Sequence, residues 1–176
     1  MTNDLHITQQ FFGHTAPVTK VQTHPKLSQS EFSAKSDFYS DLFLSASMDW
    51  TVKLWSPKCK DEPLFTFENA QDYVYDVEWS SVHPSIFACC DGDGFLEVWD
   101  INKDTEEPIA HKQGAKRTAL NCLKWSSDGR KIAVGDSDGF VNLWNIDKEV
   151  SQPKGDMEFL RFEELVKAQL QQLKAI

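Results

Sequence analysis

Long apolar stretches are absent from this sequence of 176 residues. A membrane-spanning helix needs about 20 consecutive apolar residues, and no run approaches that length. The N-terminus is polar and lacks the apolar segment of a secretion signal. We therefore expect a soluble chain that does not insert into membranes.

The sequence lacks the cysteine patterns of metal-binding and disulfide-rich domains. The four cysteines form neither a Cys-x-x-Cys pair nor the ladder of a small secreted disulfide domain. Cys89 and Cys90 are adjacent in an apolar run, so in a strand they would point to opposite faces as small buried side chains. This pattern favours a reducing compartment, the cytoplasm.

Positive charge is also in deficit. The chain has 18 Lys and Arg against 27 Asp and Glu, which gives a net charge of −9. From Ser151 onward four acids balance four bases, so the whole excess lies before that residue. Because such a surface repels phosphate, we expect neither nucleic acid nor anionic lipid as a partner.

What the sequence does contain is one motif in three copies, separated by intervals of 44 and 45 residues. In each copy an aspartate stands six residues before a tryptophan that ends an apolar-alternating run: Asp49 with Trp55, Asp93 with Trp99, and Asp138 with Trp144. This spacing predicts an all-β fold, the WD40-type β-propeller, whose repeats supply about four strands in roughly 40 to 45 residues. Propellers close with about four to eight blades, so three repeats predict an incomplete ring.

The repeats divide the chain into five segments. We expect an outer strand of a preceding blade at residues 1–12, WD repeats at 13–68, 69–111 and 112–150, and a C-terminal helix at 155–176. Asp-Gly turns at 93–94 and 138–139 predict tight hairpins. The first repeat carries an insert of about a dozen residues with four serines at 26–37. This loop is either a phosphorylation target or an unstructured surface insertion, which we favour.

The C-terminal segment has the period of an amphipathic α-helix. Asp156, after Gly155, is a candidate N-cap. The helix either packs back on the propeller, which we favour, or docks on a partner. Its apolar residues recur at intervals of three and four along one face: Phe159, Phe162, Val166, Leu170 and Leu173.

The first repeat contains a serine, a histidine and an acid, which are the residue types of a hydrolase triad. In WD40 repeats a Gly-His, a Ser or Thr, the turn Asp and the strand Trp form a hydrogen-bonded tetrad that locks the blade. We assign that role to His14, Ser45, Asp49 and Trp55. The other copies replace the serine by Cys89 and Val134, which packing tolerates and catalysis would not, so we expect no enzyme.

Metal sites are weakly supported. His24-Pro25 and His83-Pro84 recur after the first strand of two repeats, but equivalent places in different blades lie far apart. The acids at 91–93 and 136–138 lack the spacing and terminal glutamate of an EF-hand loop. We expect no metal and no cofactor.

Trp50 is the candidate for partner binding. It occupies the turn position held by Gly94 and Gly139 in the other copies, so its ring should project near the rim. Tryptophan is a frequent interface anchor. The alternative is that Trp50 packs on the edge of its own blade.

Five stretches have sequences that are more specific than the general WD40 pattern: residues 45–55, 72–80, 83–84, 87–89 and 132–137. Together they resemble the C-terminal WD repeats of the cytoplasmic dynein intermediate chain, over about residues 10 to 147. The resemblance implies a non-catalytic scaffold subunit of a cytoplasmic, microtubule-associated motor complex. Its propeller would dock on the tail of the dynein heavy chain, beside other motor-complex subunits. The extended region that binds light chains and dynactin in that family has no counterpart here, so those partners are not carried over.

Two alternatives stay open. One is a substrate receptor of a ubiquitin ligase, which should carry Trp-Asp-x-Arg; the best match here is Trp99-Asp100-Ile101-Asn102. The other is a WD40 interaction scaffold of a different kind. Because half a ring would expose unpaired edges, we expect either a fragment of a longer protein, which we favour, or completion by another chain.

Overall fold

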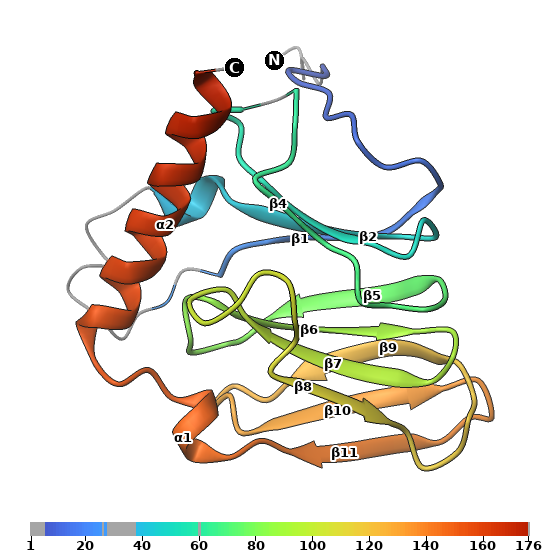
Figure 1. Cartoon of the computed structure of the whole chain (residues 1–176). Helices are drawn as coiled ribbons and strands as arrows, with labels where there is room; N and C mark the ends of the chain where they lie inside the picture. Colours follow the sequence, from blue (N-terminus) through green and yellow to red (C-terminus); the bar gives the residue numbers. More distant parts are fainter. Residues whose placement is uncertain (1–5, 26, 28–37, 60, 176) are drawn as a thin grey trace, which may run out of the picture.

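Three antiparallel sheets follow one another along the chain in this computed structural model (Figure 1). The structure describes residues 6–25, 27, 38–59 and 61–175. Each sheet is a blade whose strands lie in sequence order. The first blade contains β1 Val18–Thr23, β2 Phe43–Ser47, β3 Val52–Trp55 and β4 Phe65–Phe67. The second contains β5 Val74–Trp79, β6 Ile86–Asp91, β7 Phe95–Asp100 and β8 Ala110–Gln113, and the third β9 Leu120–Trp125, β10 Lys131–Asp136 and β11 Val141–Asn145.

The three blades share one register. The first strand pairs with the second with a bulge after its first residue, between Val18 and Lys20 in β1, and again in β5 and β9. A bulge bends and twists its strand, so the three inner strands have the same local geometry. Residues of different blades can therefore be compared position by position.

The turn between the second and third strands confirms the predicted hairpins. Gly94 and Gly139 have φ angles of 89° and 87°, which glycine adopts without steric cost. Trp50 holds the same position in the first blade with a φ of 71°. Figure 1 shows these turns at one end of the molecule. We call this end, formed by the β2–β3, β6–β7 and β10–β11 turns, the turn end.

Residues 6–12 do not form a strand in the structure, which gives them no regular secondary structure. Strands are defined by hydrogen bonds to a neighbour, and the described residues offer this segment no neighbouring strand. The preceding blade therefore stays a prediction. Of the predicted insert only Leu27 is described, and it is buried; the four serines lie outside the described residues.

The third blade has three strands among the described residues. After β11 the chain forms the short helix α1 Lys148–Ser151 and then α2 Asp156–Lys174. Helix α2 lies at the end of the strands opposite the turn end (Figure 1). Among the described residues, no helix is both long and apolar enough to cross a membrane.

Helix α2 packs back on the blades, which is the alternative that we favoured from the spacing of its apolar residues. Four residues of the predicted face are buried, and Leu173 is partly buried against the same core. Tyr39, in the short 3-10 helix η2 Tyr39–Asp41, donates a hydrogen bond from its hydroxyl to the carbonyl of Phe159, at 2.8 Å. The predicted cap is corrected: Gly155, with a φ of 113°, is the N-cap, and Asp156 is the first helical residue. There its carboxylate is favourable to the helix dipole.

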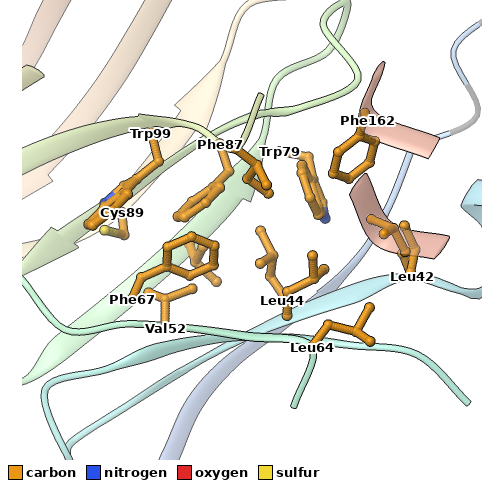
Figure 2. Close-up of a cluster of buried hydrophobic side chains, with 14 of the residues drawn as sticks. Leu42, Leu44, Val52, Leu64, Phe67, Trp79, Phe87, Cys89, Trp99 and Phe162 are labelled. Carbon is orange, nitrogen blue, oxygen red and sulfur yellow. The ribbon is translucent and has the colours of Figure 1, made fainter. Parts of the chain in front are cut away.

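Two apolar cores lie between adjacent blades. The larger joins the first and second blades to α2, and Figure 2 shows Phe67 and Val52 facing Phe87 and Cys89, with Phe162 of the helix beside Trp79. The smaller lies between the second and third blades and contains Cys90. The adjacent cysteines thus point to opposite faces, as predicted, and burial raises the pKa of both thiols.

Candidate functional site

The four side chains assigned to the tetrad meet in the first blade. The Trp55 indole donates to Ser45 Oγ at 2.7 Å, Ser45 Oγ lies 2.6 Å from His14 Nε2, and His14 Nδ1 lies 2.8 Å from Asp49 Oδ2. Ser45 and Trp55 come from paired strands, whereas His14 precedes β1 and Asp49 lies in the β2–β3 turn. The network therefore ties the entry of the blade to its central hairpin.

The electrostatics of this network favour a charged aspartate and a neutral histidine. Burial alone would raise the pKa of Asp49, but bonds from Thr51, the Thr15 amide and His14 outweigh it and lower the pKa to about 2. Burial lowers the pKa of His14. Ser45 is only 3 % exposed and already accepts a bond from Trp55. A substrate carbonyl cannot approach it, so the arrangement favours structure over hydrolysis.

In the second blade a different residue, Glu97, binds the indole of the tryptophan, and it was not predicted from the sequence. Its buried carboxylate accepts from the indole of Trp99 at 3.0 Å and lies 2.9 Å from Nδ1 of His111. Asn69 donates to the same carboxylate, and the Cys89 thiol is 3.6 Å from it. The available signal was an acid two residues before the tryptophan, on the same face of a strand that is otherwise buried.

The repeat aspartates of the later blades do not join their tryptophans. Asp93 pairs with Arg117 at 2.9 Å, and Asp138 with Lys116 at 3.4 Å. Both bases lie between β8 and β9. Where Asp49 is part of an internal network, these two acids anchor a connecting loop at the turn end.

Trp50 is exposed, in agreement with the expectation that its ring projects at the rim. The residue is 49 % exposed and lies in the β2–β3 turn at the turn end, opposite α2. Two more aromatic side chains, Tyr73 and Phe140, are exposed there. Tyr73 is placed by its carbonyl, which accepts from the Gly92 amide in the β6–β7 turn at 3.0 Å, and Phe140 directly follows the β10–β11 turn. Each blade thus contributes one exposed aromatic residue to the turn end.

The two His-Pro histidines make separate sets of contacts under α2. The ring nitrogens of His24 lie 2.9 and 2.8 Å from the carbonyl oxygens of Pro25 and Pro84, and burial lowers its pKa to about 4. His83 instead lies 3.3 Å from the hydroxyl of Ser85. Within the described ranges, no group of three or more His, Cys, Asp or Glu residues is placed to hold a metal ion.

Comparisons with known proteins agree with this geometry. Residues 12–146 match the family model described as the dynein axonemal intermediate chain 3 WD40 domain. The cytoplasmic dynein 1 intermediate chain of Drosophila melanogaster is 40 % identical over 129 residues, which cover 73 % of this chain and 18 % of that protein. The ciliary dynein intermediate chain 2 of Heliocidaris crassispina is 33 % identical over 100 residues, covering 56 % and 14 %. The chain thus spans less than a fifth of the curated relatives it matches.

Solved structures support the fold. The C-terminal WD40 domain of Sif2 superposes with a TM-score of 0.61 at 22 % identity, covering 78 % of this chain and 34 % of that one. The WD40 domain of Toxoplasma gondii coronin gives a TM-score of 0.61 at 26 % identity, covering 76 % and 32 %. Both matches cover about a third of the other protein's chain, which fits the partial propeller seen here. With the family match over more than half of its length, this chain belongs to the WD40 family of dynein intermediate chains, a non-catalytic family.

Proposed function

We propose that this chain is part of a scaffold subunit of a microtubule motor complex in the cytoplasm, and that its turn end docks on the tail of a dynein heavy chain. Membership of the dynein intermediate chain family supports the first part. The second part is carried by Trp50, whose large ring is exposed at the end of the molecule that α2 leaves open.

The backbone conformation of Trp50, with its positive φ, is energetically unfavourable. A non-glycine residue at positive φ costs roughly 1 kcal/mol or more, and the two other blades avoid that cost with Gly94 and Gly139. About half of the residue, 49 %, stays exposed to solvent in this chain. An aromatic side chain that is strained and half exposed fits a role at an interface, where a tryptophan can contribute 2 kcal/mol or more.

Trp50→Gly tests this role because it copies the other two turns. We expect the affinity for a heavy-chain tail fragment to fall at least tenfold, while the melting temperature stays the same or rises slightly as the strain is relieved. The measurement is a binding titration beside a thermal melt. Met157→Ala is the matched control, since this exposed apolar residue lies on α2 at the opposite end. A lower melting temperature with unchanged affinity would show that Trp50 serves its own blade instead.

The ubiquitin ligase alternative receives no support from the structure. At the place where a ligase receptor should carry arginine, Asn102 is 2 % exposed and donates from Nδ2 to Glu158 of α2. That position is therefore covered by the helix. A ligase adaptor serves as the comparison bait in a pull-down with the heavy-chain tail, and capture by the adaptor alone would reverse the assignment.

A further inference from the structure

The interface between the second and third blades differs from the interface between the first and second in the outer strand that contributes to it. The pairing of β4 with β3 and of β8 with β7 puts Lys112 at the position of Phe67. By the same register Ala110 takes the position of Phe65. Where the first blade presents two phenylalanines to its neighbour, the second therefore presents an alanine and a lysine.

Phe67 fills the outer part of the first interface. It is 2 % exposed, and its ring lies 5.0 Å from that of Trp99 and 4.8 Å from that of Phe87. In the third blade the tryptophan at the position of Trp99 is Trp144, which is only partly buried. The second outer strand carries no aromatic ring at the position of Phe67, so space is left beside Trp144.

That space is a cavity of about 440 Å³ between the second and third blades, beside α1. Its volume falls in the range of roughly 300–1,000 Å³ that is typical of ligand pockets. An apolar group that enters it makes the kind of contact that Phe67 makes in the first interface. The walls of the cavity are mostly apolar and include Leu96, Val98, Ala110, Lys112, Trp144 and Val150.

One positive charge at the cavity is unpaired. Lys103 lies 3.3 Å from Asp100. The carboxylate of Asp147 caps α1 by accepting from the amide of Glu149. Lys112 is exposed and has no acidic partner among the described residues. A group that fits the cavity therefore combines an apolar body with a carboxylate near the Lys112 ammonium.

A segment of a partner protein fits this description better than a small metabolite does. Pockets for small molecules orient their ligand with several convergent polar groups, whereas Lys112 is the one charged side chain of the described walls that is not otherwise engaged. A phenylalanine side chain needs only the apolar walls, and an acidic residue next to it can reach the exposed ammonium. The first interface uses this combination, because Phe67 is followed by Glu68.

We propose that the cavity between β8 and Trp144 binds a phenylalanine of a partner protein, with an aspartate or glutamate next to it in the partner's sequence. The ring lies against Trp144 as that of Phe67 lies against Trp99. The carboxylate pairs with Lys112. Because the cavity lies beside α1, which Figure 1 shows at the end of the strands opposite the turn end, this site is independent of heavy-chain docking.

A capped synthetic peptide of residues 62–68 is the probe, because it carries Phe67 next to Glu68. Added at millimolar concentration to the isotopically labelled chain, it should shift the NMR signal of the Trp144 indole N–H. The same peptide with both phenylalanines replaced by alanine should bind at least tenfold more weakly, since no ring is left to bury. These changes lie in the peptide, so the fold of the chain is not at issue.

Lys112→Phe copies the first interface and closes the cavity. We expect it to abolish peptide binding and to raise the melting temperature by about 2–4 °C, because a ring of the chain itself then covers Trp144. Gln113→Phe is the matched control. The neighbouring residue of β8 points to the opposite face of the strand, so peptide binding should be kept.

A double-mutant cycle between chain and peptide tests the ion pair. Lys112→Gln in the chain, or replacement of both glutamates of the peptide by glutamine, should each weaken binding about two- to fivefold. The two changes together should weaken it no more than either alone, because they remove the same interaction.

Four results of these titrations would each overturn the proposal: equal binding by the alanine peptide, undiminished binding to Lys112→Phe, additive effects of the two charge changes, and shifts confined to the free edge of β11. Phenylacetate bound as tightly as the peptide would overturn it too, and would assign the cavity to a small molecule. Self-association of the chain that Lys112→Phe removes in sedimentation would assign the cavity to a second copy instead.

Discussion

At the scale of single residues, Asp91 shows how one difference between repeats leaves a buried carboxylate with too few hydrogen-bond donors. It is 2 % exposed; Oδ1 accepts from the Phe95 amide, while no donor among the described residues reaches Oδ2. In the third blade the equivalent Asp136 also accepts from Asn142, but the second blade has Glu97 at that place, and a carboxylate has no hydrogen to donate. Burial therefore raises the pKa of Asp91 to about 6.

This pKa predicts an effect on stability with a definite sign. Because the folded pKa of Asp91 lies above its usual value of 3.8, the folded state holds the proton more tightly, and the contribution of Asp91 to stability falls as pH rises from about 4 through 6. Asp91→Asn removes the charge. We expect it to raise the free energy of unfolding by on the order of 1 kcal/mol at pH 7.5 and to have little effect at pH 4.

Urea unfolding of wild type and variant at the two pH values measures this difference. Asp136→Asn is the control, since both oxygens of that carboxylate are bonded, and it should bring no gain at pH 7.5. A pH-independent effect of Asp91→Asn would mean that the charge is not the cause.

At the scale of elements, helix α2 is an integral part of the first two blades. Phe162 is fully buried, with its ring stacked 6.0 Å from that of Tyr39 and close to His24 and Trp79. Truncation of a buried phenylalanine to alanine costs about 3–5 kcal/mol. Phe162→Ala should therefore lower the free energy of unfolding by about that amount.

Chemical denaturation followed by fluorescence and circular dichroism checks this expectation. Met157→Ala, which changes an exposed residue of the same helix, should leave the transition unchanged. Were Phe162→Ala as harmless as Met157→Ala, the helix would be free of the blades and available to a partner.

At the scale of the whole molecule, the two cores differ in size. Among the described residues, twenty buried side chains form the cluster of the first two blades and α2, against ten between the second and third blades. The third blade also leaves one face open, with Val141 and Leu143 of β11 exposed. Since local opening costs less where few apolar contacts are lost, the third blade should open first.

Hydrogen exchange compares the three blades directly. β2, β6 and β10 are the second strands of their blades and pair on both sides. We expect amides of β10 to exchange at least tenfold faster than those of β2 and β6. Equal protection in all three strands would instead mean that the blades unfold as one cooperative unit.

The sequence by itself determined the repeating unit and the turns between its strands. The alternation of apolar residues, the Asp-Gly turns and the interval of 44 and 45 residues act through neighbours in the chain, so the strands of the three blades and the buried face of α2 followed from them. The tetrad around Ser45 could be assigned for the same reason, since its residues match positions of one repeat. Trp50 was notable because glycine stands at its place in the other two turns.

Only the tertiary structure decided how the repeats meet. Glu97 as the partner of Trp99, the absence of a described fourth strand beside β11, the packing of α2 and the contacts between inner strands depend on groups that the folded chain brings together. The Glu78 carboxylate and the Trp125 amide, for example, are 47 residues apart. A local pattern records that a side chain is buried on one face of a strand; which distant donor satisfies it depends on how neighbouring blades pack, and no single repeat contains that information.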